Sequence, residues 1–123
     1  MEGGARRVAW VLAAAILPGL PAAAALAGDG WEPLDGDGIR RALTERRLNF
    51  AGGGWQTFAE DGGTMRQDGG LTRGRWEVRG DRFCAIFPPA EDWTCHAVAR
   101  NAQARSIRFT AGDGTTTEGI YSD

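Results

Sequence analysis

The sequence contains no lysine and a single histidine, His96, among its 123 residues. One histidine does not make up a zinc site, which needs several histidine or cysteine ligands. A catalytic cysteine–histidine pair is also excluded if the two cysteines are bonded to each other, because no free thiol is then left. The serines, Ser106 and Ser122, do not lie in the context of a nucleophile elbow, and the glycines fall in DGG and AGG turns rather than in a phosphate-binding motif. We therefore predict that the protein is not an enzyme and holds no metal or cofactor.

Basic residues are not in excess either. Residues 28–123 carry twelve arginines against fifteen acidic residues, a net charge of −3. The arginines are spread along the chain and interleaved with acids, whereas a nucleic-acid-binding protein concentrates a basic surplus on one face. We predict no nucleic-acid partner.

A long hydrophobic run occurs only near the N-terminus. An arginine pair precedes the run VAWVLAAAIL, two prolines interrupt the segment after it, and small residues at Ala25 and Ala27 match the cleavage pattern of a secretory signal peptide. The alternative, an uncleaved anchor, has about the length that a bilayer needs, but the prolines and a glycine disfavour it. We predict a signal peptide at 1–27 and one mature domain at 28–123. The protein would then lie in the periplasm or be secreted, and would meet the membrane only through the signal segment before cleavage.

The two cysteines, Cys84 and Cys95, are predicted to form a disulfide in such an exported chain. They lie in RFCAIF and TCHAVAR, on either side of PPAEDW. If the turn is centred near Pro89–Ala90, they fall opposite each other in an antiparallel hairpin of 82–87 with 94–100. A redox-active pair would show the closer CxxC spacing. Closing a loop of this size stabilises a domain by about 3 kcal/mol in the chain-entropy model.

From residue 47 onward, short alternating stretches between glycine turns predict a mainly β fold, an antiparallel meander of about seven or eight short strands. In LTRGRWEV, for example, Trp76 and Val78 share one face and charged residues the other. Such a sheet removes its edges by curling or by closing into a small barrel, and the sequence leaves that choice open. Before the strands, LDGDGIRRALTERR predicts one short helix capped by Asp35 or Asp37. Ahead of the helix, 28–33 reads as a loose arm with Trp31 packed back onto the domain.

The apolar side chains suffice for one core. In the cysteine hairpin, the alternation places Phe83, Ala85 and Phe87 on the same face as His96 and Val98 if the cysteines pair. The complete set expected in the core is Leu34, Ile39, Leu43, Leu48, Phe50, Trp55, Phe58, Met65, Leu71, Trp76, Val78, Phe83, Ile86, Phe87, Trp93, Val98, Ile107, Phe109 and Ile120.

Several short motifs carry a resemblance to a known group of proteins. The order DGG, GRWEV, DRFCAIFPP and WTCH, between residues 58 and 100, is similar to small exported proteobacterial proteins of unknown function that share a G-R-W strand and two cysteines. The resemblance implies an exported β domain. It implies no activity for any residue of this chain.

The aromatic residues suggest binding rather than catalysis. We predict a non-enzymatic binding module, either a small barrel that holds an apolar ligand or an inhibitor-like domain. The alternative is a cell-envelope accessory or structural protein that acts through a protein partner. The candidate contact residues are Trp93, His96, Trp55 and Phe87. For His96 the other interpretation is a packed side chain with a hydrogen-bond partner. A ligand-sized cavity would favour the first function, and a filled interior with an exposed patch at 88–93 the second.

Overall fold

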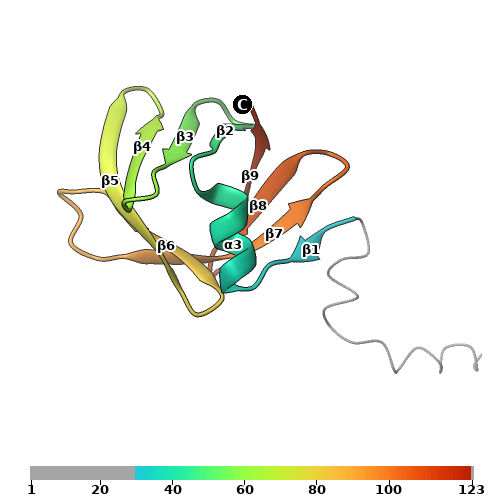
Figure 1. Cartoon of the computed structure of the whole chain (residues 1–123). Coiled ribbons are helices and arrows are strands. Elements are labelled where there is room, and N and C mark those ends of the chain that lie inside the picture. Colours follow the sequence, from blue (N-terminus) through green and yellow to red (C-terminus); the bar gives the residue numbers. More distant parts are fainter. Residues whose placement is uncertain (1–29, 123) are drawn as a thin grey trace, which may run out of the picture.

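The computed structural model describes residues 30–122, so the predicted signal peptide lies outside the described part of the chain. Eight strands, each antiparallel to the next along the chain, form a meander, and the last strand pairs with the first (Figure 1). The predicted meander is confirmed, and it is a closed barrel. The strands are β2 (Arg47–Phe50), β3 (Trp55–Phe58), β4 (Gly63–Gln67), β5 (Leu71–Arg79), β6 (Arg82–Ile86), β7 (Thr94–Asn101), β8 (Ser106–Thr110) and β9 (Thr116–Tyr121).

A ninth strand, β1 (Glu32–Pro33), pairs with β7 beyond the short stretch over which β7 pairs with β6. β6 pairs with β7 only over Thr94–His96, and β1 pairs with the later part of β7. The segment 28–33 was expected to be a loose arm. Its described part, 30–33, is instead held by this pairing and by the 2.9 Å hydrogen bond that the Leu34 N–H donates to the Val98 carbonyl. Trp31 is buried as predicted, beneath the guanidinium of Arg108.

The cysteine hairpin forms in the predicted register. Cys84 lies directly opposite Cys95, and a disulfide joins them. Phe83 lies opposite His96, so these two side chains share one face of the sheet. That face is the interior of the barrel, since Phe83, Ala85 and Val98 all belong to the core cluster.

One helix, α3 (Gly36–Leu43), closes one end of the barrel. The Asp35 carboxylate accepts a 2.8 Å hydrogen bond from the Gly38 N–H, so Asp35 rather than Asp37 is the cap. Asp81, in the β5–β6 turn, accepts a 2.9 Å bond from the Gly36 N–H. A Cβ atom at Gly36 would overlap the carbonyl oxygen of Gly80, so this close approach of helix and turn requires glycine.

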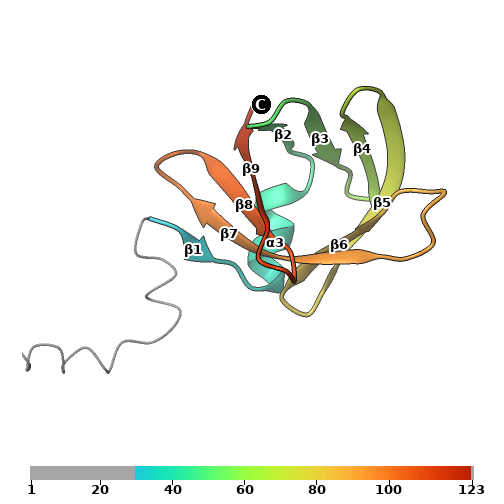
Figure 2. The ribbon, with the colours of Figure 1, turned by 180° about the vertical axis from the view of Figure 1, so that it is seen from behind.

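The other end of the helix is attached to the β3–β4 turn. The Glu45 N–H donates to the Phe58 carbonyl at 2.7 Å, and the Glu45 carboxylate accepts from the Glu60 N–H at 2.7 Å. In a meander, successive turns alternate between the two ends of the barrel. The helix therefore covers the end that carries the β3–β4 and β5–β6 turns, in front of the strands in Figure 1 and behind them in Figure 2.

The core fills the helix end. Ile39 and Leu43 are fully buried, and the ring of Phe58 meets Trp76 and Phe83 edge-on at centroid distances of 5.7 and 5.6 Å. Six residues expected in the core lie outside the core cluster: Trp55, Met65, Leu71, Ile86, Trp93 and Ile120.

Two of these six, Leu71 and Ile120, are more than half exposed. Strand alternation explains both errors. Trp76 faces inward on β5, so Leu71, an odd number of residues away, faces outward. On β9 the inward positions belong to Gly119 and Tyr121, and Ile120 between them faces solvent.

Candidate ligand-binding cavity

A cavity of about 380 Å³ lies inside the barrel, and none of its lining residues belongs to the helix. Its walls come from seven of the eight barrel strands, all except β5, and from the β2–β3, β4–β5 and β6–β7 connections. Those three connections are at the end of the meander opposite the helix. The cavity is therefore the unfilled, open end of the barrel.

Phenylalanine rings form the apolar part of this cavity. Phe83 meets Phe109 at a centroid distance of 5.2 Å, and Phe109 meets Phe50 at 6.4 Å. Phe83 and Phe109 are buried members of the core, so the cavity rests on the packed layer below it. These rings come from β2, β6 and β8, and strand alternation points all three inward.

Arg66 supplies a positive charge to the same space. It lies on β4 at an inward position and lines the cavity. Its guanidinium carbon lies 4.0 Å from the centre of the Phe87 ring. The ring of Phe87 in turn occupies the space beside Gly74, where a Cβ atom would overlap it. Glycine on β5 thus leaves room for the Phe87 ring, which contacts Arg66.

A short polar chain borders the arginine. The buried Gln56 lies opposite Arg66 in the β3–β4 register, and its Nε2 donates a 2.9 Å hydrogen bond to Thr64 Oγ1. The Thr64 hydroxyl donates onward to the carbonyl of Thr57 at 2.7 Å. These bonds hold the Gln56 amide in one orientation at the cavity wall.

His96 lines the cavity on the other side, with its ring 6.4 Å from Phe83 and 6.3 Å from Phe109 between centroids. Burial against this apolar wall lowers the pKa of His96 below its ordinary 6.5; Arg82 adds to the lowering, and Asp113 opposes it. The neutral form of the ring therefore predominates at pH 7. Its Nδ1 atom is buried without a hydrogen-bond partner among the described residues.

Asp113 lies in the β8–β9 turn and acts on His96 only through its charge. The backbone N–H and the hydroxyl of Thr115 bond to its carboxylate and lower its pKa, and His96 contributes in the same direction. His96 and Asp113 are not joined by a hydrogen bond in the described part of the chain. The geometry is not that of a histidine activated by a carboxylate.

The structure brings two of the four candidate contact residues together. Phe87 and His96 both line the cavity. Trp55 and Trp93 do not: the guanidinium of Arg47 lies 4.4 Å from the Trp55 ring, and that of Arg79 lies 4.6 Å from the Trp93 ring. A role for either tryptophan as a contact residue remains a prediction.

The sequence reasoning missed Arg66 and Gln56. In GTMRQ the apolar residue, Met65, was expected to face the core. The register with β3 and β5 instead turns Thr64 and Arg66 inward and leaves Met65 on the outer face opposite Thr57 and Arg73. The sequence did offer one signal of a polar cavity wall. Gln56 lies two residues before Phe58, so it shares the inward face of that strand.

A clustered metal site is absent from the part of the chain that the structure describes. Residues 30–122 contain no group of three or more histidine, cysteine, aspartate or glutamate side chains placed to hold a metal ion. Over the same residues, no helix has the length and apolar character to cross a membrane. The Cys84–Cys95 disulfide is consistent with an oxidising compartment.

No protein family model, curated protein or solved structure matches this chain. The resemblance to small exported proteobacterial proteins therefore stays a prediction.

Proposed function

We propose that the protein is an exported, non-enzymatic binding module that holds a small, largely apolar ligand in the open end of its barrel. The observation that carries this proposal is the cavity of about 380 Å³ bounded by phenylalanine rings. Small-molecule sites in proteins are concave, mostly apolar spaces of about 300–1,000 Å³ with a few polar groups. The cavity lies near the lower end of that range, which favours a small ligand.

The sizes of the inward-facing residues explain why the open end of the barrel contains a cavity. An eight-stranded barrel is just wide enough to be filled by side chains or to hold one small ligand. At the helix end, large residues such as Phe58, Trp76 and Leu43 fill it. At the open end, Ala85, Thr94 and Thr117 take corresponding wall positions, and no helix enters.

Export to the periplasm or to the outside of the cell is part of the proposal. The disulfide supports it, because such bonds persist in oxidising compartments. The signal-peptide pattern in 1–27 supports it independently.

The alternative function, action through a protein partner, requires an exposed apolar patch near 88–93. The loop residues Pro88, Pro89 and Ala90 are exposed, but they are followed by two exposed acids, and Trp93 is partly covered by Arg79. This arrangement supports the alternative less than the cavity supports a ligand.

A neutral fluorescent probe tests the proposal directly. We expect N-phenyl-1-naphthylamine to bind the mature, oxidised protein saturably at one site, with an increase in fluorescence. Thr117 is exposed at the cavity rim, so Thr117→Trp should fill the space and weaken binding at least tenfold. Its neighbour Thr116 points to the outer face, which makes Thr116→Trp the matched control, and that variant should bind like the wild type.

Absence of saturable binding to the wild-type protein would overturn the proposal. So would equal binding by the wild type and Thr117→Trp, because the probe would then sit elsewhere.

A further inference from the structure

We infer that the ligand of this barrel carries a single carboxylate, and that Arg66 binds it. The inference rests on the proposed function, since it names the chemistry of the ligand for the same cavity. It is carried by the contacts of Arg66, which differ from those of several arginines on the outside of the barrel.

The guanidinium of Arg66 makes no hydrogen bond or ion pair with any residue in 30–122. Several arginines on the outside of the barrel do have carboxylate partners. Arg108 lies 2.7 Å from Glu118, and the guanidinium of Arg79 pairs with Glu77. Arg66 is also the only arginine among the residues that line the cavity in the described chain. The fold thus leaves the arginine that faces the cavity without a bonded counter-charge among the described residues.

The mode of contact leaves the arginine ready for an anion. A guanidinium stays charged under all ordinary conditions and carries five N–H donors in its plane. The Phe87 ring lies against Arg66 at 4.0 Å, a contact that stabilises the cation without using those donors. A planar fork of donors matches the two oxygens of a carboxylate, which it can bind through two parallel hydrogen bonds.

The other residues that line the cavity indicate the chemistry of the rest of the ligand. Phe50, Phe83 and Phe109 offer an apolar surface, and His96 beside them is predominantly neutral at pH 7, since burial lowers its pKa. A short aliphatic chain or one aromatic ring would lie on these phenylalanines while its carboxylate reaches Arg66.

The charge balance favours one negative charge rather than two. Asp68 follows Arg66 by two residues and lines the rim of the same cavity. A phosphate group carries more negative charge than one arginine neutralises, and Asp68 would repel the excess. Arg66 can neutralise the single charge of a monocarboxylate, so less unbalanced negative charge then lies beside Asp68 than with a phosphate. We therefore assign the site to small apolar monocarboxylates.

Competition experiments test this assignment. Octanoate and the isosteric octanamide would each be titrated against bound N-phenyl-1-naphthylamine at pH 7.5. We expect octanoate to compete at least tenfold better than octanamide with the wild-type protein, because a charge-assisted bidentate contact is stronger than a neutral one. In Arg66→Gln the two compounds should compete equally, with binding of the neutral probe retained.

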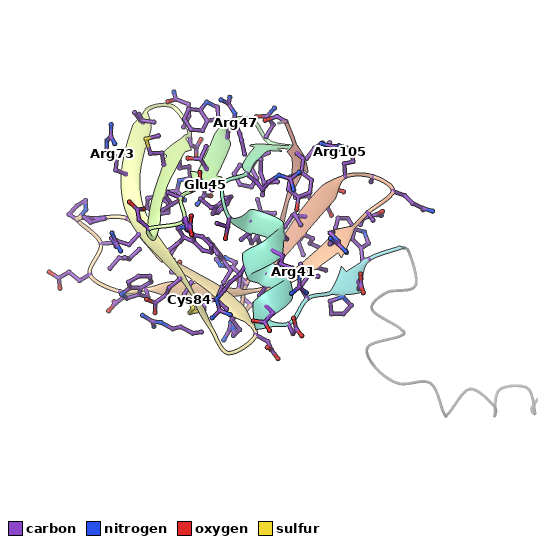
Figure 3. All side chains as sticks on the ribbon, viewed as in Figure 1. Arg41, Glu45, Arg47, Arg73, Cys84 and Arg105 are labelled. Carbon is purple, nitrogen blue, oxygen red and sulfur yellow. A yellow bond between two sulfur atoms is a disulfide. The ribbon has the colours of Figure 1, made fainter. Side chains whose placement is uncertain are left out.

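The chain offers a matched control on the neighbouring strand. Arg73 on β5 is exposed and extends away from the barrel (Figure 3). Arg73→Gln removes the same charge from the outer face and should keep the preference for octanoate. Arg66→Met, which keeps an unbranched stem against Phe87, should repeat the result of Arg66→Gln and covers the case in which the glutamine variant folds poorly.

Each outcome is decisive. Equal competition by acid and amide in the wild type would overturn the carboxylate assignment while leaving the binding barrel intact. A preference for octanoate that survives in both Arg66 variants, or that is also lost in Arg73→Gln, would overturn the role of Arg66. If the wild-type protein bound no neutral probe, the proposed function would be overturned, and the carboxylate assignment that rests on it would be overturned as well.

Discussion

The hydroxyl of Tyr121 donates a 2.7 Å hydrogen bond to the carbonyl oxygen of Ala42, 79 residues earlier in the chain. Ala42 lies in the last turn of the helix, where carbonyl groups have no partner within the helix. The bond therefore attaches the final barrel strand to the helix that closes one end. One contact thus joins β9, the last strand of the barrel, to the helix α3.

Removing this hydroxyl should destabilise the fold. Tyr121→Phe keeps the ring, against which Arg46 stacks, and leaves the Ala42 carbonyl without its donor. We expect the free energy of unfolding to fall by about 1–2 kcal/mol, measured by urea denaturation. Ser122→Ala removes an exposed hydroxyl one residue later and should change stability by less than about 0.5 kcal/mol. Equal effects of the two substitutions would show that the bond to Ala42 does not matter.

The helix cap can be assigned by a matched pair of acids. Asp35→Ala removes the carboxylate that accepts from the Gly38 N–H and should cost about 1 kcal/mol of stability. Asp37→Ala removes an exposed acid that pairs with Arg40 on the helix surface, and it should cost no more than about 0.5 kcal/mol. The reverse order in thermal or urea unfolding would contradict Asp35 as the cap.

The disulfide should supply a large part of the stability of so small a domain. Reduction, or the double substitution Cys84→Ala with Cys95→Ala, should lower the free energy of unfolding by about 3 kcal/mol. The measurement compares urea unfolding of the oxidised protein, the reduced protein and the double variant. If oxidised and reduced protein unfold at the same urea concentration, the bond is not a stabilising element.

Gly74 is required by the close approach of the neighbouring strand and the segment after it. A Cβ atom there would overlap the carbonyl oxygen of Ile86 and crowd the ring of Phe87. We expect Gly74→Ala to cost about 1–3 kcal/mol, because a close-packed wall accepts an added methyl group poorly. Gly70→Ala, in the β4–β5 turn, has open space around the new atom and should be nearly neutral in the same unfolding assay. A neutral Gly74→Ala would mean that β5 and β6 separate easily at this point.

His96 should make stability depend on pH. Its pKa is lowered in the folded protein, mainly by burial, so the unfolded chain binds a proton first as the pH falls below about 6.5. The free energy of unfolding should therefore decrease from pH 7.5 toward the lowered folded pKa, and level off below it. The depressed pKa of Asp113 acts in a separate window, below its ordinary 3.8.

The variants His96→Gln and His96→Phe carry no titrating ring and should lose the decrease in stability that begins as the pH falls toward 6.5, whatever their absolute stability. Urea unfolding at several pH values measures this slope. A slope that persists unchanged in both variants would assign the dependence to another group.

Much of the fold followed from local patterns in the sequence. Glycine turns marked the strands, the aspartates at 35 and 37 marked the start of the helix without deciding between them, and the eleven-residue spacing of Cys84 and Cys95 predicted their register. Each of these signals depends on residues close together in the chain. Local backbone chemistry therefore determined them, and the structure confirms them.

The tertiary structure decided which face of each strand became the inside. Alternation separates the two faces of β4, but it does not determine which face the barrel encloses. The apolar character of Met65 led to the prediction that its face lies inside, and that prediction was wrong. Closure of β9 onto β2 and pairing with β3 and β5 turned Arg66 inward instead. The cavity, its arginine and the contact between Tyr121 and Ala42 all depend on residues far apart in the chain, and only the closed barrel brings them together.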